Sequence, residues 1–188
     1  MNQDRFSPFP ELHTERLLLR RVTRADEQEV FFLRSDARVN AFVGRQRAQT
    51  LDDARRHIQK LDEGLSKNEG ITWAIVPEGS RQMLGSVVLW NIDWAAQKAE
   101  TGYELHPDVQ GRGLMLEALQ AVLTYCFQTL HLRRIEAFTL GENLASVRLL
   151  KKCGFARDEA AEAAFQAEYP DDPPFQIYIL SAPSGVPA

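Results

Sequence analysis

The stretch that decides the fold is Gly102-Tyr-Glu-Leu-His-Pro-Asp-Val-Gln-Gly-Arg-Gly-Leu-Met-Leu-Glu117. It begins as a strand, continues through a glycine-rich turn at Gln110–Gly113, and runs directly into a helix with a clear apolar period. The first turn of a helix leaves N–H groups without partners and carries partial positive charge. The two glycines let an anion approach the backbone and Arg112 adds positive charge, so the stretch predicts a pyrophosphate-binding turn.

The glycine pair is not specific by itself, because a tight turn before a helix has the same composition. A Rossmann motif would need a third glycine where Leu116 stands, and a βαβ unit before it. A P-loop would need Gly-Lys-Ser/Thr, which does not follow Gly113. The residues therefore exclude the two commonest nucleotide-binding turns and leave open whether this one binds a ligand.

Outward from this stretch, strand and helix patterns alternate, and Thr50 with Asp53 forms a capping-box-like helix start. Strands are predicted over 17–22, 72–76, 83–90, 101–106, 134–139, 155–164 and 175–180. Helices are predicted over 25–35, 51–65, 114–130 and 144–153. We expect an α/β fold with a mixed central sheet of about seven strands flanked by about four helices. One domain should span 1–188, with a core of about 12–180 and loose termini at 1–11 and 181–188.

Composition narrows the function classes. The 188 residues are 44% hydrophobic and 26% charged with a net charge of −4, which provides no basic field for nucleic acid or an anionic membrane. The sequence contains neither a signal-peptide pattern nor an apolar run long enough to span a bilayer, so we expect a cytoplasmic protein. Cys126 and Cys153 lie in helical patterns without CxxC or histidine partners, and we expect core residues and no metal.

A second group of polar residues opens a later helix. Asn143 and Ser146 stand at its start, and Cys153-Gly-Phe155 stands at its end. Helix capping explains Asn143, Ser146 and Gly154 without any ligand.

Together, however, Gln110-Gly-Arg-Gly-Leu-Met115 and Asn143-x-x-Ser146…Cys153-Gly-Phe155 resemble the two acetyl-CoA motifs of the Gcn5-related N-acetyltransferase (GNAT) superfamily. Leu12-His-Thr-Glu-Arg-Leu-Leu-Leu-Arg20 and Glu100-Thr-Gly-Tyr-Glu-Leu105 look like the branch containing the RimJ/RimL-type ribosomal-protein alanine N-acetyltransferases. The resemblance covers about residues 12–180, in the right order and spacing.

The resemblance implies the GNAT acyl-CoA N-acyltransferase fold, with a splay between the fourth and fifth strands that receives the pantetheine arm. Arg148, Lys151 and Lys152 could reach the CoA phosphates, although a solvated helix face explains them equally well. The residues implied to bind acetyl-CoA are Glu104, Leu105, Gln110, Gly111, Arg112, Gly113, Leu114, Met115, Asn143 and Ser146.

For catalysis, the resemblance assigns Ser146 to protonating the thiolate and Glu168 to the general base. Glu104 is the second candidate base because it lies on the strand that faces the splay, unless it faces solvent. A solvated strand-end charge explains Glu168 equally well. The sequence departs from the family in several places. Met115 replaces a small residue, about three residues are inserted before Glu168, and Tyr169–Pro174 replaces an Asn-Gly turn. Four aromatic residues could line an acceptor pocket or belong to the core: Trp73, Trp90, Trp94 and Tyr103.

The leading hypothesis is an N-acetyltransferase that moves an acetyl group directly from acetyl-CoA to a primary amine. The acceptor could be a ribosomal-protein-type N-terminus or a small molecule, and the protein could be a monomer or a homodimer. One alternative is a regulatory acyl-CoA-binding module without catalysis; another is a structural domain without a ligand.

Overall fold

The computed structural model describes residues 5–183 and has a single mixed β-sheet in that range. Its strand order is β1-β2-β3-β4-β5-β6-β8-β7, and only the β5–β6 pair is parallel. The strands are β1 Leu12–His13, β2 Leu17–Arg21, β3 Ile71–Pro77, β4 Gly85–Asp93, β5 Lys98–Leu105, β6 Arg134–Leu140, β7 Ala156–Arg157 and β8 Phe175–Ser181.

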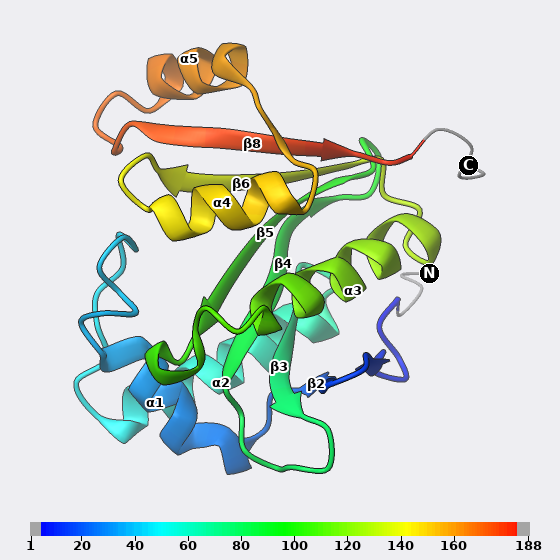
Figure 1. The fold of residues 1–188 in the computed structure, drawn as a ribbon, viewed down its shortest axis with the longest axis vertical. Coiled ribbons are helices and arrows are strands. Elements are labelled where there is room, and N and C mark those ends of the chain that lie inside the picture. Colours follow the sequence, from blue (N-terminus) through cyan, green and yellow to red (C-terminus); the bar gives the residue numbers. More distant parts are fainter. Residues whose placement is uncertain (1–4, 184–188) are drawn as a thin grey trace.

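The helices pack on this sheet as Figure 1 shows. They are α1 Glu27–Ser35, α2 Leu51–Ser66, α3 Leu114–Gln128, α4 Leu144–Lys152 and α5 Glu159–Glu168, with short 3-10 helices η1 Arg24–Asp26 and η2 Pro107–Val109. Within residues 5–183 this gives eight strands and five α-helices, against the seven and four expected. The additions are β1 and α5.

Two apolar clusters lie on opposite faces of the sheet, because successive strand side chains point to opposite sides. On β3, Trp73 belongs to the larger cluster with α3 and α4, whereas Ala74 belongs to the smaller cluster with α1 and α2. Both side chains are fully buried. The sheet is therefore covered by α3 and α4 on one face and by α1 and α2 on the other.

The parallel pair β5–β6 is joined only at its beginning. Three residue pairs are in register, ending at Glu100 and Glu136, although β5 continues to Leu105 and β6 to Leu140. In Figure 1 the two strands start together at the right and separate toward the left. The expected splay between the fourth and fifth predicted strands is confirmed.

The prediction of a strand over 155–164 is wrong beyond its first residues. Only Ala156–Arg157 pairs with β8, and α5 begins at Glu159. The Asp158 side chain accepts the Ala161 N–H at 2.9 Å, which caps the helix. Half of the ten residues in α5 are alanine, the best helix former, and this local preference decides the conformation.

The terminal segments expected to be loose are partly within the core. Residues 1–4 and 184–188 lie outside the described residues. Phe6 is 3% exposed and belongs to the larger apolar cluster, so the core begins before residue 12. At the other end, the Ala182 N–H donates to the Arg133 carbonyl at 2.9 Å, which ties the chain to the sheet just beyond β8.

The Asp26 side chain, just before α1, accepts hydrogen bonds that fix the start of this helix. This side chain is 4% exposed and receives two hydrogen bonds from Arg20, at 2.7 and 2.9 Å, and one from the Thr23 N–H at 2.8 Å. Burial alone would raise the pKa of Asp26, but these hydrogen bonds outweigh it and lower the pKa below its ordinary value.

We expect Asp26→Asn to lower the free energy of unfolding by about 2 kcal/mol at pH 7, because it removes one partner of a largely buried ion pair. The native stabilisation is present above the unfolded pKa of about 3.9 and is lost as pH falls through the lower folded pKa. The difference between the two proteins in urea unfolding should therefore shrink below about pH 4. Asp62→Asn, in the exposed pair with Arg21, is the control and should change stability by less than about 0.5 kcal/mol. A pH-independent difference for Asp26→Asn would contradict this account.

Candidate active site

A cavity of about 390 Å³ opens where β5 and β6 separate. Ser86, Val88, Trp90 and Glu104 line it from the face covered by α1 and α2, where Arg34 and His57 also contribute. Thr101 and Tyr103 of β5 point the opposite way, toward the α4 side, where Asn143 and Ser146 complete the lining. The cavity therefore spans the splay and reaches both faces of the sheet.

The turn before α3 has the open backbone that the sequence predicted. Within residues 5–183, no N–H group from Gly111 to Leu116 donates to a backbone carbonyl. Gly111 and Gly113 have φ of 75° and 78°, the left-handed region that side chains disfavour. In Figure 1, α3 and α4 have their N-terminal ends toward the side where the strands separate. These amides form a possible anion site at that end of α3.

The shape of this turn is fixed by contacts on both sides. The Gln110 side chain donates from Nε2 to the Leu105 carbonyl at 3.0 Å, which ties the turn to the end of β5. Arg16 donates from Nη1 to the Arg112 carbonyl at 3.1 Å and also pairs with Glu117 at 2.6 Å. The Arg112 guanidinium itself caps the Asp108 carbonyl at 3.0 Å. The backbone is thus held in place before any ligand binds.

Met115 does not crowd the turn. Its side chain is 9% exposed and belongs to the apolar cluster beneath α3. Only its backbone lies on the side of the open amides, so the larger residue is accommodated by the core.

Ser146, in the first turn of α4, lines the cavity beside a residue of β5. Its Oγ lies 2.8 Å from the Tyr103 hydroxyl. The Ser146 N–H donates to Asn143 Oδ1 at 3.1 Å, so Asn143 caps α4 as expected. Burial is the main cause that raises the pKa of Tyr103 above its ordinary value, and the phenol is therefore protonated at neutral pH. The pair provides hydroxyl donors inside the cavity.

Glu104 lies on the opposite face of β5 from Tyr103. Its Oε2 accepts from Arg45 Nη2 at 2.5 Å, and its Oε1 lies 3.4 Å from Ser86 Oγ. Arg45 is held in turn by Asn40, whose Oδ1 accepts from Nε at 2.7 Å. Glu104 is thus a carboxylate in the cavity, with its orientation fixed by the loop between α1 and α2.

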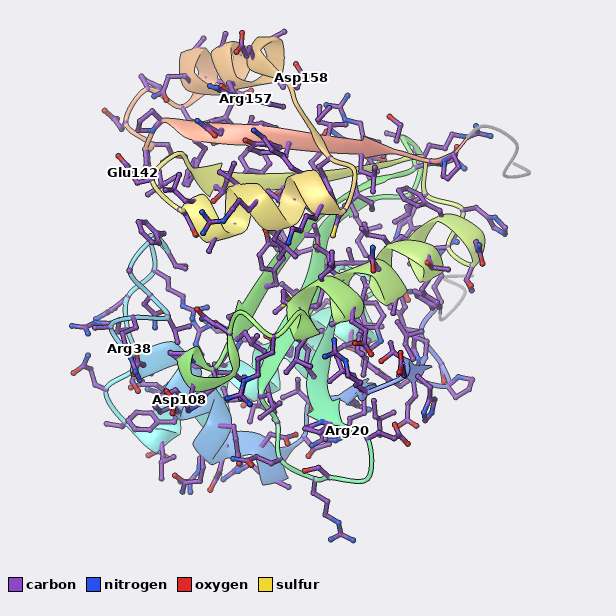
Figure 2. All side chains as sticks on the ribbon, viewed as in Figure 1. Arg20, Arg38, Asp108, Glu142, Arg157 and Asp158 are labelled. Carbon is purple, nitrogen blue, oxygen red and sulfur yellow. The ribbon has the colours of Figure 1, made fainter. Side chains whose placement is uncertain are left out.

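That loop also approaches η2, which precedes the turn at Gln110–Gly113. Arg38 pairs with Asp36 at 2.8 Å and approaches Asp108 of η2 at 3.8 Å. Figure 2 shows Arg38 and Asp108 on neighbouring segments at the edge of the molecule. Phe42 and Val43, farther along the loop, are 41% and 43% exposed and line the cavity mouth.

Glu168 is not brought to this cavity. It is exposed at the last position of α5 and is not among the lining residues. Of the four aromatic residues considered for an acceptor pocket, Trp90 and Tyr103 line the cavity. Trp73 is fully buried in the core, and Trp94 packs against Phe6.

The cysteines behave as small core residues. Cys126 is fully buried, Cys153 packs partly buried against the same cluster, and both are free thiols.

In the part of the chain that the structure describes, no three His, Cys, Asp or Glu side chains gather into a metal-binding group. None of the helices between residues 5 and 183 has the length and apolar character needed to cross a membrane.

Comparison with known proteins decides the family. A family model described as "Acetyltransferase (GNAT) domain" matches residues 16–156, from β2 to the beginning of β7. The chain belongs to the GNAT acetyltransferases. It is therefore an N-acetyltransferase, and GNAT enzymes use acetyl-CoA as the acetyl donor.

Individual GNAT relatives extend over nearly the whole chain. An uncharacterised N-acetyltransferase of Bacillus subtilis, YoaA, is 30% identical over 173 residues, which are 92% of this chain and 96% of the relative. A RimL ribosomal alpha-N-protein acetyltransferase solved with coenzyme A has a TM-score of 0.78 at 20% identity, covering 92% of this chain and 98% of its own. A spermidine N-acetyltransferase of Vibrio cholerae, solved with CoA and spermine, has a TM-score of 0.69 at 21% identity, covering 77% and 83%. The likeness to these two structures establishes the shared GNAT fold.

Sequence reasoning missed several residues of this GNAT site. The partnership of Tyr103 with Ser146 was missed, as were Arg34, Arg45 and His57 on the face covered by α1 and α2. For Tyr103 a signal existed: strand alternation places residue 103 opposite Glu104, on the α4 side. The other three lie on a helix or loop far from the motifs, and their approach to β5 depends on tertiary packing.

Proposed function

We propose that this enzyme transfers an acetyl group directly from acetyl-CoA to a neutral primary amine, within a single domain. The observation that carries the proposal is the continuous cavity through the β5–β6 splay, which joins the Ser146 side to the Glu104 side. An amine entering on one face can therefore meet a thioester held on the other. Direct transfer is favoured because no cysteine is among the residues that line the cavity in the described chain.

The residues present fit acetyl-CoA. The open amides from Gly111 to Leu116 suit a pyrophosphate, and the edge of β5 that β6 leaves open beyond Glu100 offers backbone groups to a pantetheine arm. The Asn143 side chain lies at the same opening. We propose that these groups and the Gln110–Met115 turn bind the co-substrate.

Ser146 and Tyr103 are proposed to serve the leaving group. As the amine nitrogen bonds to the acetyl carbon, the carbon–sulfur bond breaks and the sulfur acquires negative charge. A hydroxyl donor at that position stabilises the charge and delivers a proton. The Tyr103–Ser146 contact of 2.8 Å supports a relay in which the phenol reinforces the serine as donor.

A carboxylate is proposed to receive the proton that the amine loses. A free α-amine has a pKa near ~8 and a lysine-type amine near ~10.4, so an α-amine needs only a weak base at neutral pH. Glu104 faces the cavity and Glu168 does not, which favours Glu104, acting through water.

The two glutamates can be separated by steady-state kinetics. We expect Glu104→Gln to lower kcat by about 10-fold, because the variant keeps the size of the side chain and loses its basicity. Glu168→Gln should leave kcat within about twofold, as its exposed side chain lies outside the cavity. Release of free thiol from acetyl-CoA measures both rates. The reverse order of effects would assign the base to α5.

The proposal as a whole is tested by the same thiol assay with a panel of N-terminal peptides and small amines. Turnover with at least one primary amine and the appearance of its N-acetyl product by mass spectrometry are expected. Tight acetyl-CoA binding by calorimetry with no turnover on any acceptor would instead support a regulatory binding module. Absence of both would remove the assignment of the 110–115 turn to the co-substrate.

A further inference from the structure

The acceptor side of the cavity is the part on the face covered by α1 and α2, opposite Ser146, where the proposed reaction places the amine. This side contains more positive than negative charge. Its charged lining residues are Arg34, Arg45 and Glu104. Arg45 is already neutralised by Glu104 at 2.5 Å and further held by Asn40 at 2.7 Å. This leaves the Arg34 guanidinium as the group with unsatisfied charge.

Arg34 has an unusual partner for a half-buried guanidinium. Its Nη1 lies 3.3 Å from His57 Nε2, and no ion pair joins its side chain to a carboxylate within residues 5–183. Because Arg34 can only donate, His57 Nε2 accepts and the ring carries its proton on Nδ1. Burial, followed by the charges of Arg34, Arg45 and Lys60, lowers the pKa of His57 to about 3. The imidazole is therefore neutral at physiological pH and adds no counter-charge.

The surroundings of Arg34 disfavour the charged form of its guanidinium. Burial first and Arg45 second lower the pKa of Arg34, and Glu104 offsets this only in part. Neutral imidazole supplies a hydrogen bond and no charge, and a guanidinium has further N–H groups to satisfy. The site is therefore complementary to a carboxylate, which arginine can bind with two parallel hydrogen bonds.

The remaining walls of the acceptor side are apolar. The Trp90 indole covers Gly102 so closely that a Cβ there would lie 2.8 Å from its Cζ3. The other apolar lining residues on this side are Phe42, Val43, Leu61, Val88, Phe138 and Phe175. An acceptor that fits would have an apolar body beside its amine and its charged group.

We propose that the acceptor of this enzyme is a small apolar amine that also carries a carboxylate, as an amino acid does, and that Arg34 binds this carboxylate. The inference rests on the proposed amine acetylation and specifies its substrate class. The whole cavity measures about 390 Å³, and its Ser146 side is assigned to the thioester, so the space left on the acceptor side suits a small molecule. The excess positive charge disfavours polyamines, whose every ionisable group is cationic.

The test compares phenylalanine with 2-phenylethylamine, which has the same ring and amine without the carboxylate, and with spermidine. Thiol release is measured at saturating acetyl-CoA over several pH values, so that amine ionisation is taken into account. The wild type should prefer phenylalanine over 2-phenylethylamine in kcat/KM by about 10-fold or more, the scale of a buried charge-assisted contact. Spermidine should be the poorest acceptor.

Variants then assign the preference to one residue. Arg34→Gln should reduce the phenylalanine preference about 10-fold, and Arg34→Lys should restore part of it because the charge is kept. Arg47→Gln, at an exposed position on the same loop as Arg45 and outside the cavity lining, is the matched control and should keep the wild-type preference. Unchanged melting temperatures would show that the variants are folded.

The outcomes are distinguishable. Equal rates with phenylalanine and 2-phenylethylamine, a preference for spermidine, or an unchanged preference in Arg34→Gln would overturn the carboxylate site while leaving amine acetylation intact. No turnover with any amine would refute the proposed function, and this inference with it.

Discussion

Replacing Tyr103 by Phe is expected to lower kcat by about 100-fold while changing the Kd for acetyl-CoA less than about threefold. The phenol is partly buried, protonated and 2.8 Å from Ser146 Oγ, so its removal takes away only the hydrogen bond that supports the proposed thiolate donor. The ring remains and keeps the packing of β5 against α4. Rapid-quench or steady-state thiol release gives kcat, and calorimetry gives the affinity.

A double-mutant cycle strengthens this test. Ser146→Ala should cause a loss of similar size, and the double variant should be little worse than either single one, because the two hydroxyls act as one unit. Tyr125→Phe is the matched control. Tyr125 is also partly buried and has a raised pKa, yet it lies on α3 outside the cavity lining, so kcat should stay within about twofold. Full activity in Tyr103→Phe, or strictly additive losses, would contradict the relay.

Gly113→Val is the second large effect and acts on binding of the co-substrate. Gly113 has φ of 78°, a conformation that costs a residue with a Cβ about 1–2 kcal/mol, and more for a β-branched residue. Relief of that strain would rotate the amides at the start of α3 away from one another. We expect the Kd for acetyl-CoA to rise on the order of 100-fold, measured by calorimetry.

Gly64→Ala provides the comparison for this variant. Gly64 lies inside α2 at a position where a Cβ would meet no atom within 4 Å, and its φ is not positive. This change should leave acetyl-CoA affinity unaltered and raise the free energy of unfolding by about 0.5–1 kcal/mol, as alanine favours a helix. An unchanged affinity in folded Gly113→Val would show that the open amides do not bind the pyrophosphate.

The features that the sequence could predict are local ones. The Thr50–Asp53 capping box, the apolar period of α3 and the turn at Gln110–Gly113 depend on residues within a few positions of each other. Local reasoning also explains the one wrong element. The alanine content of 159–168 favours the observed helix over the strand predicted for 155–164.

The acceptor side could not be predicted in the same way. Arg45 reaches Glu104 across 59 positions of sequence, and Tyr103 reaches Ser146 across 43. These contacts depend on strand register, on the packing of α2 against the sheet, and on the path of the loop between α1 and α2. A short sequence motif contains no information about these long-range features. Asn143 and Ser146 could be identified because they lie in one helix turn, three positions apart.

The alternation of side chains along β5 also limits how this enzyme can change in length. Tyr103 and Glu104 are sequence neighbours that serve opposite compartments, and the ladder Ser86↔Glu104, Val87↔Tyr103 fixes which faces which. A single inserted or deleted residue between Glu100 and Tyr103, where the ladder with β4 is regular, would exchange the two compartments, placing the phenol among the guanidinium groups and the carboxylate beside Ser146. Homologous chains can therefore vary in their connecting segments and near the irregularity at Lys98, but a functional descendant must keep the register of β5 from Glu100 to Glu104.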